Sequence, residues 1–153
     1  MKTQDLIDSA GVLGPFDDPL PAQYEKQLAR MTAMVNERMS SREDIHDLLG
    51  GASLALMKDN HANHGRFIAS ILKNFHAGVL VETILWVFRT YKSRGISSAY
   101  WAAQMNAWHE VIEEVLSPED ANGILPLYQW IQVNIPLFDK LAMEALPQQH
   151  SKH

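Results

Sequence analysis

The chain has 153 residues, a net charge of −5, 46% hydrophobic residues and 20% charged residues. These values are typical of one globular domain that buries a core without crosslinks, and they exclude wholesale disorder. The absence of cysteine excludes thiol catalysis, zinc–thiolate sites and iron–sulfur clusters, and it fits a reducing compartment.

The 13 lysines and arginines are scattered along the chain. A nucleic-acid groove needs a basic stripe to neutralise phosphates, so we expect no nucleic-acid partner. The polar residues 1–10 do not form a signal peptide, and the longest apolar stretch, 77–87, is too short to span a bilayer. We therefore expect a protein of the bacterial cytoplasm without membrane contact.

Residues 1–20 are expected to form an irregular N-terminal arm, because glycines and prolines interrupt them. Within this arm, residues 3–10 have room for one or two helical turns. Pro21 then opens a helix, since a proline at the first helical position loses no hydrogen bond. The apolar stripe of this helix steps by four, three and four residues, through Tyr24, Leu28, Met31 and Val35.

A second apolar stripe begins after Ser41. Gly50 and Gly51 interrupt it, which indicates either a break in the helix or a point where another helix passes close. Asp59 and Asn60 are candidate caps for the helix that follows. The stripe of that helix consists of His64, Ile68, Ile71 and Phe75.

Residues 77–91 are apolar nearly all round, which predicts the central, buried helix of the domain. Ser97 or Ser98 caps the next helix. The apolar stripe of that helix is the most regular in the chain and consists of Trp101, Met105, Trp108, Ile112 and Val115.

The last long helical segment starts at Ser117 and Pro118, a cap followed by proline at the first helical position. Pro126 and Pro136 must break or kink this segment, and residues 147–153 are expected to fray. No segment alternates as a strand does. The sequence therefore predicts an all-α bundle of about six or seven helices in a single domain.

Two histidines are candidate ligand-binding residues. His64 lies on an apolar stripe and His76 follows a helix end, so either is a candidate axial ligand for haem. With Phe67 and Trp86 they make the candidate small-ligand site. The alternative is that His64 packs in the core with a hydrogen-bonded nitrogen and that His76 sits in a turn. Three long segments follow His76, whereas two long helices normally follow the proximal histidine of a globin.

A metal site is not predicted. His61 and His64 share a helix face, but a metal needs further ligands. The helical di-iron pattern needs two Glu-x-x-His motifs, and only Glu43–His46 has this spacing. The chain also has no nucleophile elbow, phosphate loop or dinucleotide fingerprint, so we expect no catalysis.

The aromatic residues divide between core and surface. Trp86, Trp101 and Trp108 lie on apolar faces, which favours the core. Tyr100 and Tyr128 are candidates for surface contacts with a partner. We assign the candidate protein interface to Tyr100, Trp108, Tyr128 and Trp130.

The order of several segments resembles the globin-like, non-haem helical sensor domains of bacterial regulators, such as the N-terminal domains of stressosome co-antagonists. The segments are His64-Gly-Arg-Phe67-Ile-Ala, Val79-Leu-Val-Glu82-Thr-Ile-Leu-Trp86-Val-Phe, Tyr91-Lys-Ser-Arg94-Gly95-Ile-Ser, a helix around Trp108, and Leu125-Pro-Leu-Tyr128-Gln-Trp130. This resemblance implies a globin-like fold without haem, a dimer through the last helices, and signal relay to a protein partner. With no output domain following, the protein is expected to act in trans.

Three functional hypotheses follow. The leading one is a regulatory or sensory protein-interaction module, expected to be a homodimer without a cofactor. The second is a sensor of globin type that binds haem or another small ligand. The third is a small enzyme with an acid–base histidine such as His64 or His109.

Overall fold

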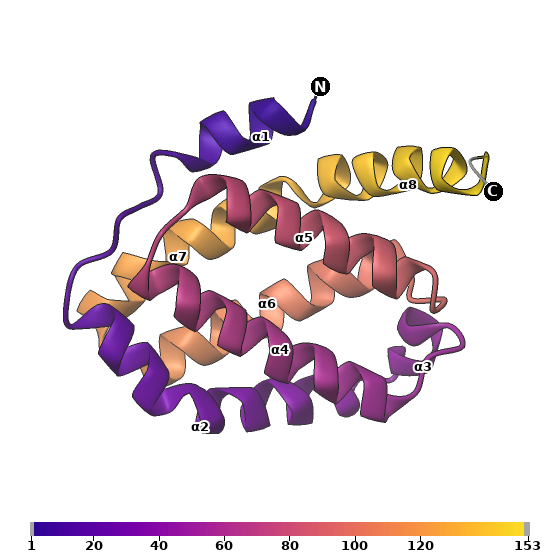
Figure 1. The fold of residues 1–153 in the computed structure, drawn as a ribbon. Coiled ribbons are helices and arrows are strands. Elements are labelled where there is room, and N and C mark those ends of the chain that lie inside the picture. Colours follow the sequence, from indigo (N-terminus) through magenta and orange to yellow (C-terminus); the bar gives the residue numbers. More distant parts are fainter. Residues whose placement is uncertain (1, 152–153) are drawn as a thin grey trace.

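The computed structural model describes the backbone of residues 2–151 and the side chains of residues 2–144. The described residues form eight helices and no strand, so the predicted all-α class is confirmed (Figure 1). In chain order they are α1 (Thr3–Ala10), α2 (Leu20–Ser40), α3 (Ile45–Leu49), α4 (Leu54–Lys73), α5 (Ala77–Lys92), α6 (Ser98–Val115), α7 (Pro118–Val133) and α8 (Ile135–Ser151).

Helix α6 forms the middle of the bundle. It packs against α2 and α7 and also touches α3 and α8. In Figure 1 it lies behind the space between α4 and α5. The regular stripe predicted from the sequence faces the core, and buried residues make up half of the helix: Tyr100, Trp101, Ala103, Gln104, Met105, Ala107, Trp108, Val111 and Ile112.

The prediction that residues 77–91 form a helix buried on all sides is wrong. Helix α5 buries one face against α1 and α8. On another face Val79 is 47% exposed and Trp86 is 61% exposed. This face stays open because α4, the preceding helix, packs mainly against α2. Within residues 2–151, no helix is both long and apolar enough to span a bilayer.

The N-terminal arm is more regular than predicted. Residues 3–10 form α1, and Leu6 and Ala10 are buried where α1 packs on α5. The Trp130 indole Nε1 donates a hydrogen bond to Ser9 Oγ at 3.0 Å, which joins α7 to α1. At the other end α8 is described to Ser151, and residues 152–153 of the predicted frayed tail lie outside the described residues.

The predicted break at Gly50 and Gly51 is confirmed, because these residues separate α3 from α4. Gly50 has a φ of +59°, and a Cβ atom at this position would collide with the carbonyl oxygen of Gly95, whose own φ is +94°. Beside this contact the Ser97 amide donates to the Leu48 carbonyl at 2.9 Å. Two interhelical turns therefore meet backbone to backbone, which only glycine permits here.

The start of α7 agrees with the sequence. Ser117 Oγ accepts a hydrogen bond from the Asp120 amide at 3.2 Å, and Pro118 occupies the first helical position. Pro126 lies inside α7, whereas Pro136 lies in the first turn of α8. The predicted interruption therefore occurs at the second proline, where α7 ends and α8 begins.

The predicted caps of α4 are wrong. Ser53, not Asp59 or Asn60, begins the helix, and its Oγ accepts a hydrogen bond from the Leu56 amide at 3.1 Å. Asn60 instead lies well inside α4, where it is only 3% exposed. This burial places an amide group in the core.

Candidate ligand-binding site

A cavity of about 240 Å³ lies between α4 and α5, with α6 and α7 supplying the rest of its lining. It forms because α4 packs against α2 while α5 packs against α1 and α8, so the two helices diverge over α6. We call it the α4–α5 cavity. Most of its lining is apolar or aromatic: Phe67, Ile68, Ile84, Trp86, Val87, Phe88, Tyr91, Trp101, Met105 and Ile131.

The polar part of the lining carries no charged group. No aspartate, glutamate, lysine or arginine side chain lines the cavity. The polar lining residues come mainly from α4, with one each from α5 and α6, and are Asn60, Asn63, His64, Thr83 and Gln104.

One chain of hydrogen bonds runs from the cavity into the core. His64 Nε2 lies 2.8 Å from the Tyr128 hydroxyl oxygen, which lies 2.9 Å from the Tyr24 hydroxyl oxygen. Tyr24 and Tyr128 are almost completely buried. The rings are packed as well as bonded, since His64 lies 5.0 Å from the ring of Trp108 and 5.4 Å from that of Tyr128, centroid to centroid.

A second set of polar groups lies nearby. His61 Nδ1 is 2.6 Å from Asn36 Oδ1, and its Nε2 is 3.1 Å from the Tyr100 hydroxyl. The Asn60 side-chain oxygen accepts hydrogen bonds from the Tyr100 hydroxyl at 2.8 Å and from Gln104 Nε2 at 2.7 Å. We refer to both sets together as the buried polar cluster.

Burial keeps the titratable members of this cluster uncharged at neutral pH. Desolvation lowers the pKa of His61 to about 4. Desolvation, with a smaller contribution from nearby His61, lowers the pKa of His64 to about 3. Burial likewise raises the pKa of Tyr24, Tyr100 and Tyr128. The cluster therefore offers hydrogen bonds but no charge.

Three of the four predicted ligand-binding residues, His64, Phe67 and Trp86, line the α4–α5 cavity together. As the alternative interpretation of His64 expected, one ring nitrogen is hydrogen-bonded inside the protein, and the partly buried side chain also lines the cavity. His76 lies elsewhere: it is exposed, and its Nδ1 accepts a hydrogen bond from the Val79 amide at the start of α5. Its position matches the alternative of a turn residue.

The cavity does not fit haem. Its volume of about 240 Å³ is below the roughly 300–1,000 Å³ of sites for drug-sized ligands, and a haem macrocycle is large for that class. His64 Nε2 is already held by Tyr128, and His76 is not among the lining residues. Neither of the two histidines predicted as axial ligands is therefore available to haem in this space.

The surface position predicted for Tyr100 and Tyr128 is wrong. Tyr100 and Trp108 are 0% exposed and Tyr128 is 1% exposed, so these three residues of the proposed interface cannot touch a partner. Their rings bury large apolar areas, and the tyrosine hydroxyls find partners inside the core. Trp130, the fourth, is partly buried and packs edge to face on Phe138.

In the part of the chain that the structure describes, no group of three His, Asp or Glu side chains is placed to hold a metal ion. His61 uses both ring nitrogens in hydrogen bonds to Asn36 and Tyr100. Both ring nitrogens of His61 and Nε2 of His64 are therefore engaged by protein partners.

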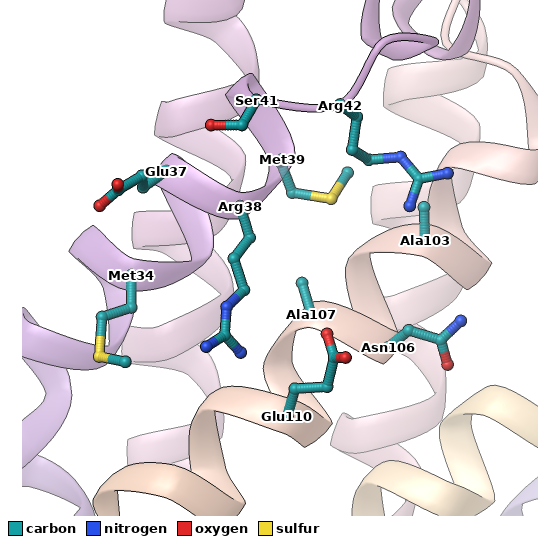
Figure 2. A pocket seen from close by; sticks show the side chains of 10 residues that line it. All are labelled: Met34, Glu37, Arg38, Met39, Ser41, Arg42, Ala103, Asn106, Ala107 and Glu110. Carbon is teal, nitrogen blue, oxygen red and sulfur yellow. The ribbon is translucent and has the colours of Figure 1, made fainter.

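A second, larger and more open groove lies between α2 and α6 and measures about 460 Å³. Figure 2 shows Arg38 and Glu110 reaching into it, while Glu37 points away. Its cations are already paired, Arg38 with Glu114 and Arg42 with Asp44. Because both arginines are engaged within the chain and the space is open to solvent, this groove is a weaker candidate than the α4–α5 cavity.

The sequence interpretation missed Asn60 and Gln104, although their spacing carried a signal. Gln104 follows Trp101 by three residues and precedes Trp108 by four, so it lies on the same buried stripe. Asn60 precedes His64 by four residues and shares its face. Polar residues on such stripes are typical of a buried hydrogen-bond network.

Comparisons with protein-family models, with curated proteins and with solved structures give no match. The resemblance to globin-like sensor domains therefore stays a prediction from the sequence. The all-α architecture rests on the described helices themselves.

Proposed function

We propose that this protein is a helical sensor module that binds one small, uncharged and mostly apolar molecule in the α4–α5 cavity. The observation that carries the proposal is an apolar cavity inside a helical bundle with a few convergent polar groups, the usual form of a small-molecule site. We favour this hypothesis over a pure protein-interaction module because Tyr100, Trp108 and Tyr128 are inaccessible to a partner.

The lining supports a neutral ligand. With no ionised side chain at the cavity, a charged ligand would lose its hydration without gaining a counter-charge, at a cost of several kcal/mol. The volume of about 240 Å³ supports a molecule of one or two fused rings, smaller than most drug-sized ligands.

Trp86 supports a regulatory role. Its side chain lines the cavity and is also 61% exposed. A ligand that contacts the inner edge of this indole would change the surface that the outer edge presents to a protein partner. We also predict, as parts of this proposal, that the helices are arranged as in a globin, that the protein forms a homodimer and that it relays its signal to a protein partner.

Equilibrium dialysis with naphthalene tests the proposal. We expect wild-type protein to bind one naphthalene per chain. Val87→Phe, which adds bulk to the cavity wall, should weaken binding at least about tenfold, because overfilling a packed site costs roughly 1–3 kcal/mol.

Val79→Phe is the matched control, because Val79 lies on the same helix and does not line the cavity. This variant should bind naphthalene as wild type does. Equal binding by Val87→Phe and wild type, with both variants folded by circular dichroism, would place the bound naphthalene outside the cavity and overturn the proposal.

A further inference from the structure

The hydrogen-bond chain Tyr24–Tyr128–His64 can run in only one direction. Tyr24 is fully buried, and its hydroxyl has Tyr128 as its one hydrogen-bond partner among the described residues. If Tyr128 donated to Tyr24, the Tyr24 hydroxyl hydrogen would be buried in the core without an acceptor. Such a loss lowers the equilibrium constant for folding about tenfold or more. Tyr24 therefore donates to Tyr128, and Tyr128 donates to His64 Nε2.

This direction fixes the tautomer of His64. Nε2 must be the unprotonated, accepting nitrogen, and the ring is uncharged, so the hydrogen is on Nδ1. Nδ1 has no hydrogen-bond partner among the described residues, and it is not one of the atoms sealed in the core without a partner. His64 lines the α4–α5 cavity, so this unpaired N–H belongs to a residue of the cavity wall.

We infer that the ligand is a flat, neutral molecule that carries a hydrogen-bond acceptor, a ring nitrogen or a carbonyl oxygen, and that His64 Nδ1–H is the group that recognises it. This inference rests on the proposed function and specifies the ligand class of the same site. A ligand without an acceptor would leave the His64 donor without a partner once water is displaced.

The amides of Asn60 and Gln104 supply a second observation. Each uses one end of its side-chain amide in the buried polar cluster, and each is at least 97% buried. The Asn60 amino group and the Gln104 carbonyl oxygen have no partner among the described residues, and both residues line the cavity. The polar wall thus offers hydrogen bonds that the protein itself does not use.

Quinoline and naphthalene test the inference, because they share a shape and differ by one ring nitrogen that accepts a hydrogen bond. We expect quinoline to bind wild-type protein about three- to tenfold more tightly than naphthalene, the net effect of one hydrogen bond. In His64→Phe this preference should vanish while naphthalene binding persists.

Nitrogen-15 NMR of the free wild-type protein tests the tautomer without any ligand, so the inference stays testable if His64→Phe does not fold. We expect the His64 resonances of an Nδ1–H, Nε2-unprotonated imidazole. The opposite tautomer would overturn the inference, as would equal binding of quinoline and naphthalene, and both results leave the proposed site standing. Binding of neither probe would overturn the proposed function as well.

Discussion

His61 is buried in the core of this bundle and His64 is partly buried at the wall of the α4–α5 cavity, and the hydrogen bonds of their ring nitrogens go to amide and hydroxyl groups and to no carboxylate. Burial lowers the pKa of His61 to about 4 and that of His64 to about 3, from an ordinary value of 6.5. The unfolded chain therefore takes up two protons near pH 6.5 that the folded chain takes up only near pH 4 and 3. These two groups therefore leave the stability unchanged above pH 7 and lower it as the pH drops toward 4.

We expect the free energy of unfolding to fall by about 3–4 kcal/mol between pH 7 and pH 5, measured by urea denaturation, because each histidine contributes roughly 2 kcal/mol over this range. His61→Gln removes one of the two groups and should show about half of the loss. An equal loss in the variant and in wild type would contradict the assignment of the pH dependence to these side chains.

At the level of single residues, a hydrogen-bonded nitrogen of His64 was the alternative to a ligand-binding role, and of the four candidate ligand-binding residues three, His64, Phe67 and Trp86, line one cavity while His76 does not. The sequence prediction failed for Tyr100 and Tyr128, because a tyrosine on a helix can face outward or bury its hydroxyl against a partner. Which of these happens depends on groups far away in the sequence. Tyr24 and Tyr128, for example, are 104 positions apart.

The start of a helix was predictable where a capping residue directly precedes a proline, as at Ser117, and was less predictable elsewhere. Ser117 makes a side-chain cap bond, whereas Ser97 occupies the same position of α6 without one. We expect Ser117→Ala to lower the free energy of unfolding by about 1 kcal/mol and Ser97→Ala to change it by much less. Similar losses in urea denaturation for the two variants would contradict the role of the cap bond.

The glycine pair between α3 and α4 offers a second matched comparison. A Cβ at Gly50 would collide with the Gly95 carbonyl at a positive φ, whereas a Cβ at Gly51 meets nothing within 4 Å. We expect Gly50→Ala to cost about 2–4 kcal/mol and Gly51→Ala to be close to neutral in thermal or urea unfolding. Two neutral variants would mean that the contact between these turns is loose.

The break at these glycines was predictable from the sequence, but the contact with Gly95 was not. Dependence on contacts with distant segments also explains why the predicted burial of α5 on all sides was wrong. Its composition indicated burial on all sides, yet burial depends on whether another helix covers each face, and α4 packs against α2 instead. The α4–α5 cavity results from this divergence, so no local sequence pattern could reveal it.

At the scale of the whole molecule, the eight helices of residues 2–151 enclose a core centred on α6, and the cavity separates α4 from the α1–α5–α8 group. The homodimer stays a prediction from the sequence. We expect size-exclusion chromatography with light scattering to give twice the chain mass at micromolar concentration. A monomer throughout that range would remove the dimer and leave the cavity proposal unaffected.

The central claim is that the α4–α5 cavity, and not the larger groove between α2 and α6, holds the ligand. Methionine methyl groups report on both places, since Met105 lines the cavity and Met34 and Met39 line the groove. In carbon-13 methyl spectra recorded during a quinoline titration, we expect the Met105 resonance to shift while those of Met34 and Met39 stay in place. Shifts at Met34 and Met39 with Met105 unchanged would contradict the claim.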